Sequence, residues 1–367
     1  MTKNKINLLK EKFMLQGEFR SVELMTNGHI NKTYKMCFFR DGEIKTYILQ
    51  KINTYVFKNP IAVMDNISGI TEYIRAKIKE KNPTAKRNVL HYQQTVDGLY
   101  YFIDDNGGFW RCYRYIDDSV TYNVTDNLKA IEESGKAFGE FPMYLADYPI
   151  DKLHIAIPHF HNTVMRYETF KKSIAEDICG RAEGVREEID GYLALEETAT
   201  AMYKMQQRGE LPLKVTHNDT KINNVLFDKD TLEHLCVIDL DTVMPGLVAF
   251  DFGDAIRFTA NTCAEDEKDL SKVALDMKKY EAFTRGFVSK VAPTLSSKEK
   301  QTLALGAVTM TVECGMRFLT DYLDGDKYFS TDYAEHNLDR SRCQLALAKD
   351  MLKHYKEMQD IVFKYCE

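Results

Sequence analysis

The sequence predicts an α+β protein in which a small antiparallel sheet with one helix precedes a larger, mainly helical part. Two observations support this prediction. Short stretches rich in β-branched and aromatic residues end near residue 117, and long segments with the apolar period of helices follow them. We therefore expect two lobes, residues 1–117 and residues 118–367.

Most of the N-terminal lobe consists of short apolar stretches separated by Asn-Gly, Asp-Gly and Gly-Gly turns. These stretches predict strands at residues 21–25, 33–39, 45–51, 99–103 and 109–116. One segment interrupts them, residues 60–81, where apolar side chains recur at helical spacing above a charged opposite face. We expect a meandering sheet on which this single helix packs.

Helical periodicity dominates the C-terminal lobe. It predicts helices at residues 127–147, 167–180, 182–209, 264–288, 297–323 and 332–361. A compact island between them has strand patterns at residues 213–215, 224–227 and 235–240. Polar residues crowd the turns of this island, so we expect the chemistry of the protein there.

The composition excludes several classes of partner. A net charge of −6, with lysines spread along the chain, gives no basic surface for nucleic acid. No apolar run approaches the length of a membrane span, and the N-terminus does not read as a signal peptide. The eight cysteines form no C-x-x-C pair, which favours reduced thiols and a cytoplasmic location.

The polar residues of the island form a specific combination. His217, Asp219 and Asn224 stand in the run T-H-N-D-T-K-I-N-N-V-L-F, and Asp239 ends the next apolar stretch, where a carboxylate needs a partner. Each residue alone fits a turn or a helix cap. Phosphoryl transfer from ATP, however, needs one Asp at the acceptor hydroxyl, and an Asn and a second Asp for magnesium. Asp219, Asn224 and Asp239 supply these groups.

The spacing H-x-D-x-x-x-x-N followed by I-D resembles the catalytic loop of the aminoglycoside phosphotransferase and choline kinase families, distant relatives of protein kinases. The resemblance implies a bilobal protein-kinase-like fold with ATP in its cleft. It implies that Asp219 is the catalytic base and that Asn224 and Asp239 bind Mg²⁺. It further implies that His217 braces the loop, and that Asp251 opens a helix and hydrogen-bonds the loop instead of binding metal.

The same resemblance places the nucleotide in the N-terminal lobe, with the catalytic and acceptor-binding groups in the C-terminal lobe. The hairpin T-N-G-H-I-N-K-T-Y at residues 26–34 would cover the phosphates, and the residues that end the sheet would meet adenine. The candidate nucleotide contacts are Asn27, Gly28, His29, Asn31, Thr33, Gln50, Tyr115 and Ile116.

The third strand departs from the kinase pattern, because Gln50 stands where a phosphate-contacting lysine is expected. Either Lys51 turns inward, or Gln50 and backbone amides hold the phosphates. Glu72 is a candidate for the helix glutamate that pairs with such a lysine, although a solvated helix face is the better interpretation.

A closer resemblance concerns the acceptor. The chain is similar, nearly end to end, to bacterial N-acetylhexosamine 1-kinases. The segments that carry this similarity are residues 28–34, 47–50, 215–221, 238–246, 251–254 and 313–323. It implies that ATP phosphorylates the anomeric hydroxyl of N-acetylglucosamine or N-acetylgalactosamine, with substrate contacts from His29, Asp219, Arg317 and Tyr328. For Asp321, four residues after Arg317, a structural role, as an intrahelical salt bridge and a capping turn, is about as well supported as a sugar contact.

Two alternatives remain open. The same catalytic residues suit other hydroxyl acceptors, such as choline, homoserine or an aminoglycoside. A nucleotide-binding protein without catalysis is the other alternative, and the missing strand lysine favours it. The presence of Asp219, Asn224 and Asp239 together argues against it.

Overall fold

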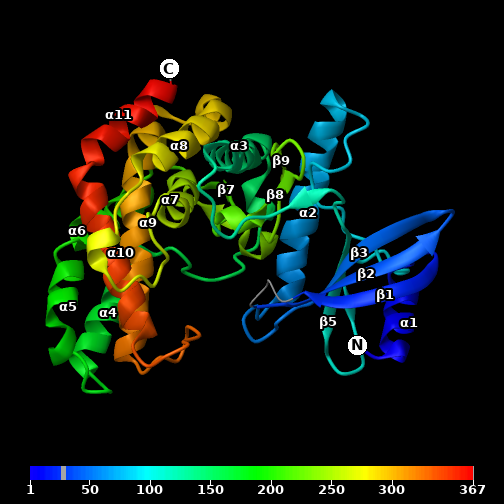
Figure 1. Cartoon of the computed structure of the whole chain (residues 1–367), viewed down its shortest axis with the longest axis horizontal. Coiled ribbons are helices and arrows are strands. Elements are labelled where there is room, and N and C mark those ends of the chain that lie inside the picture. Colours follow the sequence, from blue (N-terminus) through cyan, green and yellow to red (C-terminus); the bar gives the residue numbers. More distant parts are fainter. Residues whose placement is uncertain (26–29, 367) are drawn as a thin grey trace.

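The computed structural model describes residues 1–25 and 30–366, which form a sheet lobe and a larger helical lobe (Figure 1). The main sheet has the order β1-β2-β3-β5-β4, and all neighbouring strands are antiparallel. Its strands are β1 (Glu18–Met25), β2 (Lys32–Arg40), β3 (Glu43–Lys51), β4 (Phe102–Ile103) and β5 (Phe109–Arg114). The predicted fold class is therefore confirmed.

The first helix, α1 (Lys3–Lys12), was missed by the sequence analysis, which expected one helix in this lobe. Only three apolar residues of this segment, Ile6, Leu9 and Phe13, pack against the sheet. The apolar period that would predict the helix is therefore short. Asp104 also fixes this side of the sheet. Its carboxylate accepts hydrogen bonds from Lys5 of α1 and from Trp110 Nε1, the latter at 2.7 Å.

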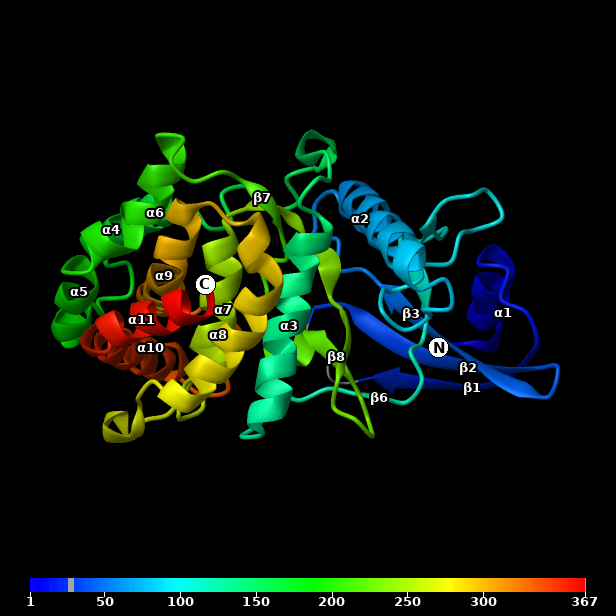
Figure 2. The same ribbon diagram turned by 90° about the horizontal axis from the view of Figure 1, so that it is seen from above.

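The second helix, α2 (Pro60–Lys81), is the predicted one, and it lies at the junction of the two lobes (Figures 1 and 2). The Asn59 side chain caps its N-terminus by accepting a hydrogen bond from the Ala62 N–H. The Asn66 side chain donates to the carbonyls of His154 and Val243 at 2.8 and 2.9 Å. The helix therefore connects the sheet to the helical lobe.

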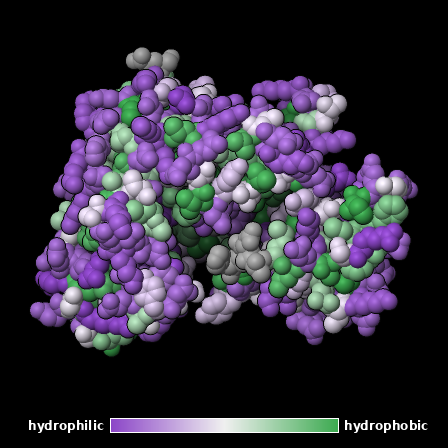
Figure 3. All heavy atoms as spheres, in the orientation of Figure 1, coloured by the Kyte–Doolittle hydropathy of each residue, from purple (hydrophilic) through white to green (hydrophobic). Residues whose placement is uncertain are grey.

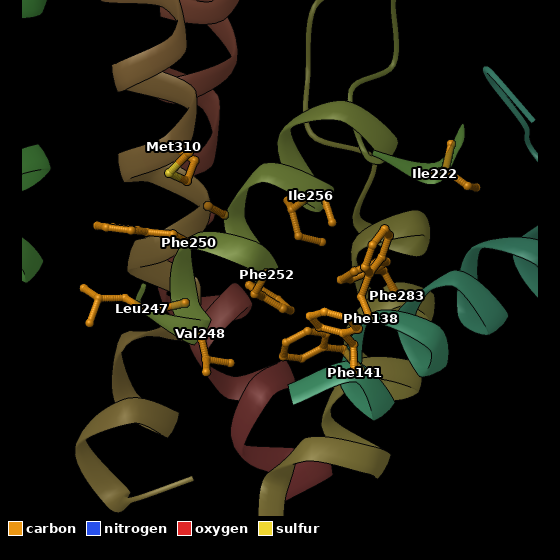
Figure 4. Close-up of a cluster of buried hydrophobic side chains, with 14 of the residues drawn as sticks. Phe138, Phe141, Ile222, Leu247, Val248, Phe250, Phe252, Ile256, Phe283 and Met310 are labelled. Carbon is orange, nitrogen blue, oxygen red and sulfur yellow. The ribbon is translucent and has the colours of Figure 1, made fainter. Parts of the chain in front are cut away.

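The helical lobe is organised around one long central helix, α9. Its helices are α3 (Leu128–Tyr144), α4 (Thr163–Glu176), α5 (Arg186–Leu193), α6 (Glu196–Gln207), α7 (Val248–Thr259), α8 (Met277–Val291), α9 (Ser297–Leu323), α10 (His336–Lys353) and α11 (Tyr355–Cys366). Gly253 of α7 and Gly306 of α9 allow these two helices to touch, because a Cβ on Gly253 would lie 2.1 Å from the Gly306 carbonyl oxygen. Figure 4 shows Phe252 of α7 inside the apolar core beside them.

Three predicted helices differ from the structure. The segment 182–209 divides into α5 and α6, and the segment 332–361 divides into α10 and α11. The apolar period continues across both short breaks, so the pattern alone does not reveal them. The helix predicted at 264–288 begins only at Met277, because Asp276 caps its first N–H groups. The residues before it form the short 3-10 turn Leu270–Lys272 and a β-bridge between Leu275 and Asn261.

The central helix also corrects an expectation about apolar length. By length and composition, α9 is able to cross a membrane, although the sequence analysis expected no such run. In the described residues, 83% of its apolar window is buried inside the protein, as expected for the central helix of a core.

Two small sheets form the polar island between the helices, at the junction of the lobes (Figure 1). Their strands are β6 (Ser119–Val120), β7 (Lys214–Thr216), β8 (Val225–Asp228), β9 (His234–Val237) and β10 (Met244–Gly246). The strand predicted at 235–240 ends at Val237, and Asp239 follows in a turn. Both small sheets are antiparallel: β10 pairs with β7, and β8 pairs with both β6 and β9.

An ionic cluster ties the start of β9 to α3. His234 Nδ1 lies 2.6 Å from Glu133, and His234 Nε2 lies 3.1 Å from Glu140. Lys136 and Lys290 flank the two carboxylates, each at 2.7 Å. Burial acts to lower the pKa of His234, but the hydrogen bonds to Glu133 and Glu140 outweigh it and raise the pKa to about 9. At neutral pH the ring is therefore an imidazolium that donates to both carboxylates.

This cluster predicts a pH-dependent stability. The pKa of His234 rises from 6.5 to about 9 on folding, so its stabilisation is complete below pH 6.5 and is lost as the pH rises through 9. We expect the free energy of unfolding to fall by about 3 kcal/mol between pH 6 and pH 9.5. Urea unfolding followed by circular dichroism measures this fall.

Two matched variants test whether His234 causes this fall in the free energy of unfolding. His234→Gln should be less stable than the wild type at pH 6 and should lose the decline above it. His154→Gln, at a side chain that is 52% exposed, should behave like the wild type. An equal decline in His234→Gln would show that other groups cause it.

Candidate active site

The catalytic loop follows β7 and is held by an aspartate from α7. Asn218 has a φ of +63°, in the left-handed region, so the loop cannot continue as a strand. The backbone N–H groups of His217 and Asn218 instead donate to the two carboxylate oxygens of Asp251, at 2.8 and 2.7 Å. Burial raises the pKa of Asp251 to about 6. The expectation that Asp251 lies in a helix and hydrogen-bonds the loop is confirmed.

His217 is fully buried and braces the loop, as expected. Its Nε2 donates to the Ile238 carbonyl at 2.9 Å, and its Nδ1 accepts the Asp219 N–H at 3.2 Å. These partners define the neutral tautomer. The ring packs edge-on against Phe138 and Phe141 of α3. His217 therefore links the backbone of Asp219 to the residue that precedes Asp239.

Asp219 and Asn224 are brought together by the structure. The Asn224 Nδ2 donates to the Asp219 backbone carbonyl at 2.8 Å and to its carboxylate Oδ2 at 3.1 Å. Lys221 Nζ lies 3.2 Å from the other carboxylate oxygen of Asp219. Because Nδ2 of Asn224 faces Asp219, Oδ1 is the atom of Asn224 that a cation would meet.

Asp239 lies beside this pair, in a turn with a φ of +59°. Its side chain is exposed, yet the surrounding protein removes much of its hydration. This loss of hydration, with the charges of Asp241 and Asp219 nearby, raises the pKa of Asp239 to about 7. Such crowding of carboxylates favours a bound cation. Within residues 1–25 and 30–366, no group of three or more His, Cys, Asp or Glu side chains forms a metal site.

The sheet lobe excludes one of the two alternatives for the third strand. Gln50 donates to Thr33 Oγ1 at 3.1 Å and lies on the same face as Arg111 of β5. Lys51 lies on the opposite face, with its Nζ 5.9 Å from the centre of the Trp110 ring. Lys51 therefore does not turn inward. Glu72 pairs with Arg75 and is exposed, as the interpretation of a solvated helix face expected.

Figure 3 shows a hollow in the surface between the two lobes. Of the remaining nucleotide candidates, Asn31 contacts the helical lobe, and Tyr115 and Ile116 follow β5. Asn31 Nδ2 donates to Asp241 Oδ2 at 2.7 Å. Tyr115 donates its N–H to the Thr46 carbonyl at 3.0 Å, and the Ile116 carbonyl accepts a hydrogen bond from Ser119 at 2.6 Å. Three candidates, Asn27, Gly28 and His29, lie outside the described residues.

On the acceptor side, Arg317 and Tyr328 are brought together. The guanidinium carbon of Arg317 lies 5.7 Å from the centre of the Tyr328 ring. Asp321 does not form an ion pair with Arg317. Its carboxylate accepts the N–H groups of Lys327, Tyr328 and Phe329 at 2.8 to 3.0 Å, which fixes the loop that carries Tyr328. Asp321 therefore acts as the capping group of this loop.

The sequence analysis missed a buried polar group next to Arg317. His161 Nδ1 lies 2.8 Å from Glu313 Oε1, and Arg166 lies near enough to Glu313 to help lower its pKa. His161 also acts to lower the pKa values of Asp251 and Asp254, so this group lies near the catalytic loop. The signal in the sequence was weak, because His161 and Glu313 are separated by 152 positions.

The analysis also gave no role to Arg111 and Asp241, which form a buried ion pair between β5 and the turn after Asp239. An arginine inside the apolar run F-W-R-C-Y was a usable signal, because a buried charge requires a partner.

The dependence of the loop on Asp251 is testable. In Asp251→Asn, the new amide group accepts from only one of the two backbone N–H groups and presents its own donors to the other. We expect the free energy of unfolding to fall by about 1 to 3 kcal/mol, measured by thermal denaturation. Asp360→Asn, at an exposed position of α11, is the matched control and should melt like the wild type. Equal melting temperatures for all three proteins would contradict the assignment.

Comparison with known proteins agrees with this geometry. Among solved structures, a microcompartment-associated aminopropanol kinase is similar with a TM-score of 0.60 at 16% identity, covering 96% of this chain and 98% of that one. Spectinomycin phosphotransferase APH(9)-Ia, solved with ADP and spectinomycin, has a TM-score of 0.54 at 14% identity and covers 100% and 98%. Ethanolamine kinase from Plasmodium vivax has a TM-score of 0.52 at 13% identity and covers 87% and 80%. At these identities the likeness shows a shared fold.

The family model for phosphotransferase enzymes (APH) matches residues 90–283, a segment that contains the catalytic loop, Asp239 and α7. This segment is more than half of the 367 residues. The chain therefore belongs to the phosphotransferase enzyme family.

Proposed function

We propose that this phosphotransferase transfers the terminal phosphoryl group of ATP to the anomeric hydroxyl of N-acetylglucosamine or N-acetylgalactosamine, giving the sugar 1-phosphate. The observation that carries the proposal is the Asp219 carboxylate, held by Asn224 and Lys221 beside Asp239 where the two lobes meet. Family membership supports the coarser statement, a small-molecule phosphotransferase. The resemblance to N-acetylhexosamine 1-kinases supports the acceptor.

Asp219 acts on the acceptor hydroxyl. One of its carboxylate oxygens accepts from Asn224 and the other faces Lys221, so the side chain is held in a single orientation. The acceptor hydroxyl would donate its hydrogen to this carboxylate, which aligns the oxygen for attack on the phosphoryl group. An anomeric hydroxyl is more acidic than an ordinary alcohol. Asp219 would therefore mostly align this hydroxyl instead of fully removing its proton before the reaction.

Asn224 and Asp239 would hold Mg²⁺. Both offer hard oxygen ligands. The raised pKa of Asp239 reflects its loss of hydration and, after that, the repulsion of nearby carboxylates, which a cation relieves. Two protein ligands suit an ion that takes its remaining ligands from phosphates and water. When bound, Mg²⁺ neutralises charge on the transferring phosphoryl group.

The sheet lobe, within residues 1–117, would bind the nucleotide, and residues 118–367 would hold the catalytic and acceptor groups. We assign the phosphate contacts to the hairpin residues Asn27, Gly28, His29 and Asn31, together with Thr33 and Gln50. The backbone of Tyr115 and Ile116 would face adenine. Thr33 and Gln50 share the face of the sheet that bears Arg111, whose partner Asp241 belongs to the helical lobe.

The sugar would lie against Arg317 and Tyr328, with His29 reaching it from the nucleotide hairpin. The charges on this side favour a neutral acceptor. Arg317, Arg166 and His161 lie around the buried carboxylate of Glu313, which is bonded to His161. A cationic amine such as choline would meet two guanidinium groups here. Glu313 Oε2 has no hydrogen-bond partner among the described residues, which suits a hydroxyl donor.

The catalytic role predicts the effect of one conservative change. Asp219→Asn keeps the shape of the side chain and removes its charge. We expect kcat to fall about 10²- to 10⁴-fold, because a positioned acid or base contributes that much. ATP affinity, measured by calorimetry, should stay close to that of the wild type. Asp230→Asn, an exposed aspartate of the hairpin after β8, is the control. Unchanged turnover in Asp219→Asn would exclude this mechanism.

The acceptor is tested by ADP release with ATP and Mg²⁺. We expect activity with N-acetylglucosamine or N-acetylgalactosamine and none with their methyl glycosides, because the methyl group blocks the anomeric oxygen. EDTA should abolish this activity, and added Mg²⁺ should restore it. Choline, ethanolamine, aminopropanol, homoserine and spectinomycin complete the panel.

The other outcomes of this panel separate the alternatives. Activity only with choline, an amino alcohol or an aminoglycoside would overturn the sugar acceptor and keep the catalytic residues. No activity with any acceptor, together with tight ATP binding, would favour a nucleotide-binding protein without catalysis.

A further inference from the structure

A row of three polar side chains crosses the face of the sheet that is turned away from α1. Thr33, Gln50 and Arg111 lie on adjacent strands in direct register, Thr33 opposite Gln50 and Gln50 opposite Arg111. Gln50 Nε2 donates to Thr33 Oγ1 at 3.1 Å, and Arg111 Nε donates to Gln50 Oε1 at 2.8 Å. These two bonds fix the orientation of the Gln50 amide. The row therefore ends in a positioned guanidinium group.

The guanidinium group reaches across to the helical lobe. Arg111 Nη1 donates to Asp241 Oδ1, and Asn31 Nδ2 donates to Asp241 Oδ2 at 2.7 Å. Asn31 is itself held, because its Oδ1 accepts the Asn53 N–H at 2.9 Å. Both oxygens of Asp241 thus receive hydrogen bonds from the sheet lobe.

The burial of this pair requires that both partners be present. The side chain of Arg111 is 1% exposed and that of Asp241 is 4% exposed. A buried charge that loses its partner is strongly unfavourable, whereas an apolar pair in the same space is often equally stable. Fold stability alone therefore gives little reason for an ion pair at this position.

The position of Asp241 in the chain gives a better reason for the ion pair with Arg111. It lies two residues after Asp239, in the short 3-10 turn Leu240–Thr242 that directly follows Asp239. Asp239 has left-handed backbone angles, φ +59° and ψ 58°, which a non-glycine residue keeps only when its surroundings hold it. The bonds from Arg111 and Asn31 hold the turn that follows it.

We propose that Arg111 is a positioning residue for nucleotide binding: acting through Asp241, it locks the nucleotide strands to the Asp239 turn and so sets the affinity for the magnesium nucleotide. This inference rests on the proposed use of ATP and Mg²⁺.

The test measures nucleotide binding directly, by calorimetry with ADP in the presence and absence of Mg²⁺, alongside steady-state kinetics. We expect Arg111→Met to weaken binding of the magnesium nucleotide about 10- to 100-fold, the size of coupling seen between groups in one network. KM for ATP should rise in parallel, whereas KM for the acceptor should stay within about twofold. Arg111→Lys should restore part of the loss, because it keeps the charge but cannot bond Gln50 and Asp241 together.

A double-mutant cycle tests whether Arg111 acts through Asp241. In the background of Asp241→Asn, the further change Arg111→Met should add little. If the two losses add, Arg111 contacts the nucleotide directly, and the proposed route through Asp241 is wrong. If Arg111→Met folds poorly, the same cycle is run with Arg111→Lys in its place, in the wild type and in the Asp241→Asn background.

Two further results complete the test. Arg114→Met is the control, at an exposed position on the same strand, and should bind nucleotide like the wild type. Wild-type affinity in a folded Arg111→Met variant would overturn the inference. Absence of nucleotide binding by the wild type itself would instead overturn the proposed function, and the inference with it.

Discussion

The backbone of the catalytic loop is the constraint on which the rest of the site depends. Asn218 is in the left-handed region, so the N–H groups of His217 and Asn218 have no partners in a regular element, and buried N–H groups require partners. Asp251 supplies both acceptors. Asp251 belongs to α7, and α7 is fixed to the central helix α9 by the contact of Gly253 with Gly306. The position of Asp219 is thus set by the core of the helical lobe.

A second constraint crosses between the lobes. The turn that contains Asp239 and Asp241 is bonded to the sheet lobe through Arg111 and Asn31, and it is bonded to the catalytic loop because Thr242 donates to the His217 carbonyl. The α2 side chain Asn66 holds the next residue, Val243. One short segment therefore connects the strands proposed to bind the nucleotide with the loop of Asp219, the proposed catalytic carboxylate. This arrangement suits a reaction whose catalysis consists mainly of positioning and charge neutralisation.

Arg317 and Tyr328, which are proposed to contact the acceptor, lie on other elements, α9 and the loop that follows it. Arg317 and Glu313 lie one turn apart on α9, and Asp321 organises the loop that carries Tyr328 by accepting its backbone N–H groups. The proposed reaction thus assigns the nucleotide to strands with fixed contacts between the lobes. It assigns Arg317 and Tyr328, on α9 and the loop after it, to the acceptor together with Asp219 and His29. Acceptor specificity is able to change there without disturbing Asp219.

The sequence by itself determined the fold class, the helix α2 and the group His217, Asp219, Asn224 and Asp239, because each rests on a local period or on spacings within one short segment. Tertiary structure decided the presence of α1, the limits of several other helices and the pairs between distant residues. The helix α1 has too few apolar residues for a periodic signal, and the breaks between α5 and α6 and between α10 and α11 leave the apolar period intact.

The side to which Lys51 turns, and the pairs Arg111–Asp241 and His161–Glu313, were equally beyond the sequence. Partners separated by 130 and 152 positions meet only in the folded chain. A charged residue within a buried segment implies that a partner exists, but only the packing of the lobes determines which residue that partner is.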